Sequence, residues 1–79
     1  MHENIINKYI QICEVQLDNE LIKGNSYYKL DIDNISWQHG YRYAIEIVKR
    51  LRKIGYKAYD ICTEDLATNN KYAGVILHM

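Results

Sequence analysis

The sequence predicts an α+β fold: a single small two-layer domain over residues 1–79, with a three-stranded mixed sheet and two helices packed on one face. Two segments repeat apolar residues at the three- and four-residue steps of amphipathic helices, and three alternate with the period of two that is typical of half-buried strands. These segments follow one another in the order α-β-α-β-β. No linker, repeat or low-complexity segment divides the 79 residues, which fits one domain with a modest core.

The first helix is expected over residues 3–22, followed by a strand over 26–32. Gly24 and Asn25 separate the two, and either residue can take the left-handed conformation that ends a helix. The core-facing residues of the helix are Ile6, Tyr9, Ile10, Cys13, Leu17 and Leu21. In the strand, Tyr28, Leu30 and Ile32 are expected to be buried.

The second helix is expected to run to Gly55 with a strong division into apolar and polar faces. Its apolar arc comprises Trp37, Tyr41, Ala44, Ile47, Val48, Leu51 and Ile54. Asp33, Asn34 and Ser36 precede the helix and can cap it. Gly40 lies on the apolar arc, where close packing against a neighbour would explain a residue that otherwise weakens a helix.

Two strands follow, over residues 56–63 and 72–78, joined by a short polar loop with an Asn69-Asn70 turn signal. They are expected to form an antiparallel hairpin, while the helix between the first two strands predicts a right-handed parallel crossover. Tyr59 and Ile61 are expected to face inward. The open face of the sheet would then carry Tyr27, Lys29, Asp31, Ala58, Asp60, Tyr72, Ile76 and His78.

The formal net charge is zero, which argues against indiscriminate attraction to nucleic acid or anionic membranes. Cys13 and Cys62 are too few and too far apart for a disulfide framework. No signal peptide or bilayer-spanning apolar run is expected, so a cytoplasmic location is predicted. Heavy use of Ile, Asn, Lys and Tyr fits AT-rich codons, as in a phage or another mobile element.

Positive charge is concentrated between residues 34 and 57, which carry six cations and one acid. One interpretation is a solvated helix face whose cations pair with Glu46 and favour the helix C-terminus. Another is a contact with an acidic partner protein, and a third is a nucleic-acid-binding surface that contacts phosphates. Its residues would be Arg42, Lys49, Arg50, Arg52, Lys53 and Lys57.

The first helix also carries a second apolar arc, roughly opposite its core-facing residues. Its members are Ile5, Ile12, Val15 and Ile22. Either the second helix covers one arc and the sheet the other, or the second arc binds a partner protein or a second copy of the chain. Tyr27 and Tyr72, expected on the open face of the sheet, are further candidates for protein binding, because tyrosine is enriched at protein interfaces.

Catalytic and cofactor motifs are lacking: the sequence has no Walker loop, dinucleotide fingerprint or nucleophile elbow. The three histidines have no carboxylate or cysteine at ligand spacing, so no metal is expected. We therefore predict a non-enzymatic protein-binding module without cofactors, such as a phage or mobile-element inhibitor of a host protein. The alternative is a nucleic-acid-binding module that uses the basic helix face.

Overall fold

The computed structural model of the chain describes residues 3–32, 37–65, 67 and 70–79, with side chains described outside 37–39, 63–65 and 70–72. Its elements confirm the predicted order α-β-α-β-β. They are α1 (Glu3–Ile22), β1 (Tyr27–Ile32), α2 (Trp37–Ile54), β2 (Lys57–Asp65) and β3 (Asn70–His78). The predicted capping residues Asp33, Asn34 and Ser36 lie outside the described residues.

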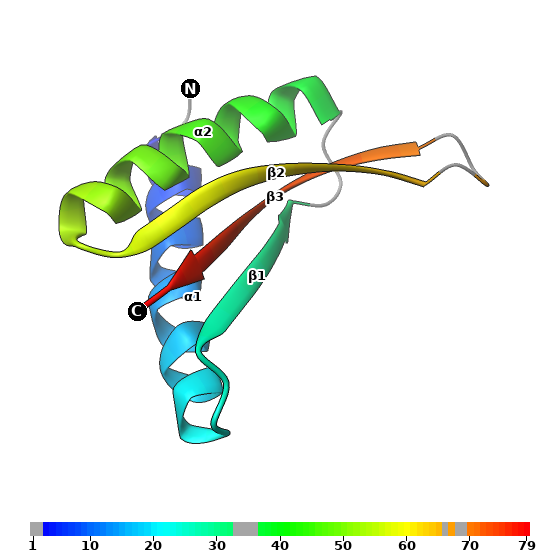
Figure 1. Cartoon of the computed structure of the whole chain (residues 1–79). Coiled ribbons are helices and arrows are strands. Elements are labelled where there is room, and N and C mark those ends of the chain that lie inside the picture. The colour runs from blue at the N-terminus through cyan, green and yellow to red at the C-terminus, as the bar shows by residue number, and fades with distance from the viewer. Residues whose placement is uncertain (1–2, 33–36, 66, 68–69) are drawn as a thin grey trace.

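The sheet has the strand order β1-β3-β2, and both pairings are antiparallel. The hairpin of β2 and β3 is as predicted, whereas the expectation of a mixed sheet is wrong. Strands β1 and β2 run in the same direction but do not pair, because β3 returns from the hairpin and lies between them (Figure 1). The crossover through α2 therefore skips one strand position.

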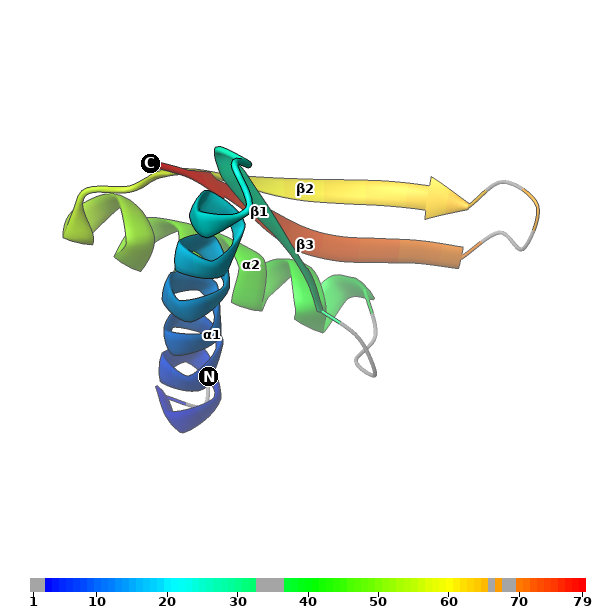
Figure 2. The ribbon, with the colours of Figure 1, turned by 90° about the horizontal axis from the view of Figure 1, so that it is seen from below.

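Both helices cover one face of the sheet, with α2 lying along β3 and β2 and α1 packing on β1. The two helices cross, and the N-terminal half of α1 extends away from the sheet beyond α2 (Figure 2). The core between these layers is formed by Ile6, Ile10, Cys13, Leu17, Leu30, Ile32, Ala44, Ile47, Val48, Leu51, Ala58, Val75 and Leu77. Eight of these residues come from the apolar faces predicted for the two helices, and Leu30 and Ile32 were also expected to be buried.

Both helices end in the same hydrogen-bonded motif. The amide of Asn25 donates to the carbonyl of Glu20 (2.8 Å), and the amide of Tyr56 donates to that of Leu51 (3.0 Å). Gly24 and Gly55 have φ of 92° and 124°, a left-handed backbone conformation that residues with a Cβ rarely adopt. The predicted helix ends are therefore confirmed, and they set where β1 and β2 begin.

The alternation along β2 is opposite to the one predicted from the sequence. Ala58 pairs with the core residue Leu77 and is buried under the helices, whereas Tyr59 is 53% exposed on the open face. Asp60 also faces the helices, where its carboxylate accepts a hydrogen bond from the Tyr41 hydroxyl and raises the pKa of Tyr41. The prediction failed because both alternating sets of β2 contain apolar residues, and pairing with β3 selects between them.

Candidate functional site

The second apolar arc of α1 remains largely exposed. Ile5 is 37% exposed, Val15 53% and Ile22 84%, while Ile12 is half-buried and packs partly against the core. Both α2 and the sheet contact the opposite side of α1, which buries Ile6, Ile10, Cys13 and Leu17. The first of the two interpretations of this helix is therefore wrong, because no described element covers the second arc.

The exposed side of α1 has a regular spacing that the sequence reading missed. Steps of three and four residues connect the arc through two polar positions, Lys8 and Asn19, which are also exposed. These six positions form the a and d set of a heptad pattern, which in coiled coils marks the contact between two helices. We call them the outer seam: Ile5, Lys8, Ile12, Val15, Asn19 and Ile22.

The basic face of α2 is partly occupied by contacts within the chain. Arg50 donates hydrogen bonds to Glu3 (2.6 Å), Asn7 (3.1 Å) and Glu46 (3.1 Å), so it joins the two helices. Arg52 donates from Nε to the carbonyl oxygen of Ala58 (2.8 Å). Two of the six cations predicted to contact nucleic acid therefore have structural partners.

The other four cations, Arg42, Lys49, Lys53 and Lys57, are exposed, and within the described part of the chain they form no ion pair. Their positions differ: Arg42 lies in the first half of α2, Lys49 and Lys53 in its second half, and Lys57 at the start of β2. The structure thus leaves a thinner basic surface on α2 than the sequence suggested.

The open face of the sheet gathers aromatic and cationic side chains at one end. Strand pairing places Tyr27, His78 and Lys57 in one row and Lys29, Ile76 and Tyr59 in the next. The rings of Tyr27 and His78 lie 5.9 Å apart, and the Arg52 guanidinium lies 5.4 Å from the centre of the Tyr59 ring. A shallow hollow of about 410 Å³ is lined by Ser26, Lys57, Tyr59, His78 and Met79.

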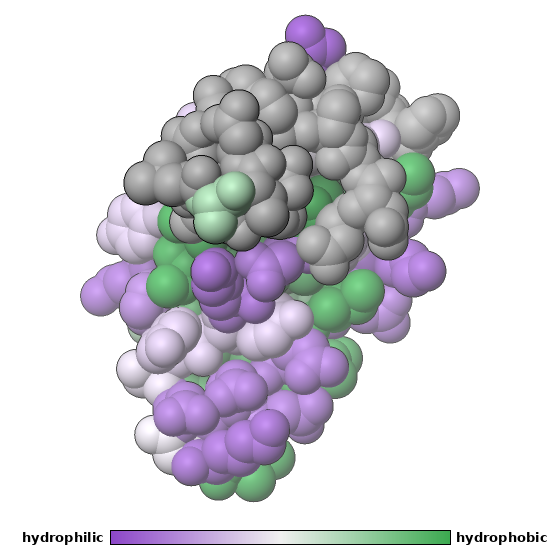
Figure 3. Space-filling view, turned by 90° about the vertical axis from the view of Figure 1, so that its right-hand side faces the viewer, coloured by the Kyte–Doolittle hydropathy of each residue, from purple (hydrophilic) through white to green (hydrophobic). Residues whose placement is uncertain are grey.

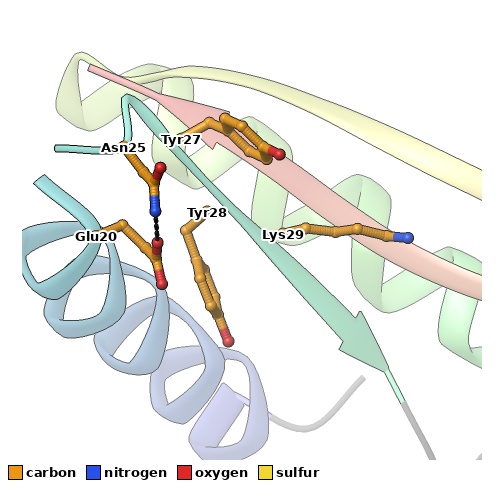
Figure 4. A pocket seen from close by; sticks show the side chains of 5 residues that line it. All are labelled: Glu20, Asn25, Tyr27, Tyr28 and Lys29. Atoms are coloured by element: carbon orange, nitrogen blue, oxygen red, sulfur yellow. Dashed lines mark hydrogen bonds between the residues drawn. The ribbon is translucent and has the colours of Figure 1, made fainter. Parts of the chain in front are cut away.

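A second hollow of about 280 Å³ lies between the end of α1 and β1, and its polar lining includes Glu20 and Asn25, joined by a 2.6 Å hydrogen bond. Figure 4 shows Tyr28 pointing toward α1, while Tyr27 and Lys29 extend from the other side of β1. Tyr27, on the open face of the sheet, therefore does not share a surface with the outer seam. The side chain of Tyr72 lies outside the described residues.

The outside of the molecule is not uniformly polar. Figure 3 shows the molecule from the end that bears the β2–β3 hairpin. In this view, hydrophilic side chains gather on the lower part of the molecule, and hydrophobic side chains reach the surface along its margins. Among the described residues, no group of three or more His, Cys, Asp or Glu side chains is placed to hold a metal ion.

Neither cysteine has the setting of a catalytic nucleophile. Burial, reinforced by Glu14, raises the pKa of Cys13 to about 12, so its thiol stays protonated at neutral pH. Cys62 is exposed and free, and it lies on the same side of β2 as Asp60. Within the described residues, no helix has the length and apolar character needed to cross a bilayer.

Comparisons with protein-family models, with curated proteins and with solved structures found no match for this chain. The two candidate binding surfaces are the outer seam and the open face of the sheet.

Proposed function

We propose that this protein is a non-enzymatic protein-binding module that docks a partner helix against the outer seam of α1. The observation that carries this proposal is the exposure of Ile5, Val15 and Ile22 on one side of a helix whose other side is fully used by the core. Apolar side chains at heptad spacing gain free energy when a second helix removes them from water.

The character of the partner follows from the seam. Four of its six positions are apolar and two are polar, Lys8 and Asn19, and polar seam positions restrict which helices fit and in what register. A module of this kind that occupies a helix of a host protein would act as an inhibitor or modulator. The free cysteines, Cys13 and Cys62, fit the reducing cytoplasm in which we expect it to act.

The substitution Val15→Asp tests this proposal, because it places a carboxylate at the centre of the seam where a bound helix would exclude water. Capture from a nuclease-treated lysate of the source cells, together with analytical ultracentrifugation of the purified protein, measures partner binding and self-association. We expect Val15→Asp to reduce binding at least about tenfold, or by roughly 1.4 kcal/mol. Its circular dichroism spectrum should remain native, because Val15 is half exposed.

The matched control is Ile45→Asp, which changes an exposed isoleucine in the middle of α2, away from the seam. This variant should bind as the unchanged protein does. If Val15→Asp binds as strongly as the unchanged protein, partners use another surface. Loss of helical signal in Val15→Asp alone would show that the second arc supports the fold.

A second candidate function is binding of single-stranded nucleic acid on the open face of the sheet. Asp31 and Asp60 would repel phosphates if both lay free on this face of the sheet. However, Asp60 faces the helices, and Lys29 approaches Asp31 to 3.9 Å. Tyr27 and Tyr59, 49% and 53% exposed, offer ring faces for base stacking.

Titration of a fluorescent single-stranded oligonucleotide of about 15 nucleotides, a length near the upper site size of one binding fold, tests this candidate. Tyr59→Ala should weaken binding about 5- to 100-fold, the effect of losing one stacked base. Lys57→Ala should reduce the slope of log K against log salt by about 0.7. The control Lys49→Ala/Lys53→Ala should change little, and a larger loss there would assign binding to α2 instead.

A further inference from the structure

We infer that the partner of the outer seam is a second copy of this chain, bound with its α1 antiparallel; this rests on the proposed function. In an antiparallel helix pair, the a positions of one helix face the d positions of the other. The seam is symmetric under this exchange about a point between residues 13 and 14. The facing pairs, one residue from each copy, are Ile5 with Ile22, Ile12 with Val15, and Lys8 with Asn19.

This symmetry makes the surface complementary to itself. A two-fold dimer uses the same patch on both subunits, so each contact must occur twice. On α1 every apolar seam residue faces an apolar one, and each polar residue faces a polar one. A seam that binds an unrelated helix does not require its own apolar and polar positions to match each other in this way.

Charge selects the antiparallel arrangement over the parallel one. In parallel register the two Lys8 ammonium groups would face each other, and like charges within an interface are unfavourable. In antiparallel register Lys8 faces the side-chain amide of Asn19, whose oxygen can accept a hydrogen bond, and the adjacent Asp18 offers a carboxylate. The flanking exposed Gln11 adds no like charge.

The length of the outer seam limits the expected affinity of the dimer. From residue 5 to residue 22 an α-helix rises about 26 Å, so a single pair of helices buries an area at the small end of specific interfaces. We therefore expect a reversible dimer that dissociates in the micromolar range or weaker, with roughly equal monomer and dimer somewhere between about 10 μM and 1 mM.

Opposite charges introduced at the two facing positions, residues 5 and 22, test the inference. Ile5→Glu and Ile22→Lys lie in the first and last turns of α1, where the helix dipole favours these charges, so the monomer should stay folded. Each variant alone should weaken self-association at least tenfold in sedimentation equilibrium. An equimolar mixture should form heterodimers, because the carboxylate introduced in one copy meets the ammonium group introduced in the other, while the second Ile5–Ile22 contact stays intact.

The matched control is Ile54→Lys, which changes the exposed last residue of α2 and should dimerise normally. If both single variants weaken the dimer and the mixture fails to recover, the antiparallel register is wrong. If the unchanged protein remains monomeric up to about 1 mM, well above the range expected for so small an interface, the second copy is excluded as the partner. In that case, capture of another protein that Val15→Asp abolishes would still support the proposed function.

Discussion

Arg50 shows how one side chain can change the interpretation of a whole surface. In the sequence it is one of six cations that could contact phosphate, but in the structure it connects Glu3 and Asn7 of α1 to Glu46 of α2. The Glu3 contact joins residues 47 positions apart in the chain, so the spacing of residues within α2 could not reveal it. Arg50 is therefore better described as part of the helix–helix contact than as a ligand site.

The pair formed by Glu3 and Arg50 predicts a pH dependence of stability. The hydrogen bond from Arg50 holds the pKa of Glu3 below its ordinary value of 4.5. A carboxyl group whose pKa is lower in the folded state stabilises the fold above its unfolded pKa, and this contribution is lost as pH falls through the folded value. Glu3→Gln should therefore lower the free energy of unfolding at pH 7, and this difference should shrink as the pH falls below 4.5 and disappear below the folded-state pKa of Glu3.

Urea denaturation at both pH values measures this effect. Arg50→Gln supplies the control, because Glu3→Gln made in that background should have no pH-dependent effect. If Glu3→Gln lowers the free energy of unfolding equally with and without Arg50, Glu3 acts through another contact. The effect should be small, since the Glu3 side chain is mostly exposed and water screens such pairs.

Among the elements, two glycines lie where α2 approaches the sheet and where β3 approaches its neighbouring strands. Gly40 of α2 lies over the sheet, and an added Cβ would lie 3.4 Å from the Ala73 Cβ and 3.6 Å from Ile32 Cγ2, so the close packing suggested from the sequence does not require a glycine here. Gly74 of β3 is tighter, because a Cβ there would overlap the Leu30 carbonyl oxygen and press on Ile61. The first site has room for a methyl group and the second does not.

We therefore expect opposite effects from the same substitution at the two sites. Gly40→Ala should raise the free energy of unfolding by up to about 1 kcal/mol, because alanine favours the helix and its contacts are ordinary. That gain corresponds to roughly 4–8 °C in Tm for a domain of this size. Gly74→Ala should lower stability by about 1–3 kcal/mol through overpacking. Thermal unfolding of both variants checks the pair, and destabilisation by Gly40→Ala would show that Ala73 and Ile32 cannot accommodate the methyl group.

The arrangement of the elements also explains why α1 has a free apolar side. It is a 20-residue helix that packs on an edge strand and crosses α2, so only one side of it is needed by the domain. By contrast, α2 lies along both β2 and β3 and is covered over a wider arc. A helix at the margin of a two-layer fold keeps a free face, and on α1 that face is apolar.

At the scale of the molecule, the 79-residue chain forms a globule with a radius of gyration of 12.5 Å. A domain of this size buries a smaller fraction of its surface than a larger one and has limited stability in reserve. Dimerisation through α1 would add apolar burial that the monomer lacks and would make stability depend on protein concentration.

The sequence was enough to predict the two helices, their ends at Gly24 and Gly55, the three strands and the hairpin. These features depend on local rules of periodicity and left-handed glycine, which act within a few residues. It also identified Ile5, Val15 and Ile22 as apolar residues beyond the needs of one helix face. Their exposure could not be read from the sequence, because it depends on where α2 and the sheet lie.

The three-dimensional structure was needed to establish the position of β3 between β1 and β2, the alternation along β2 and the partners of Arg50 and Arg52. In β2, Ala58 and Tyr59 could each face inward by their own chemistry, and pairing with Leu77 buries the smaller one. Long-range contacts of this kind are selected by the packing of the whole sheet. For the same physical reason the second apolar arc of α1 was visible in the sequence, while its freedom to bind a partner was visible only in the fold.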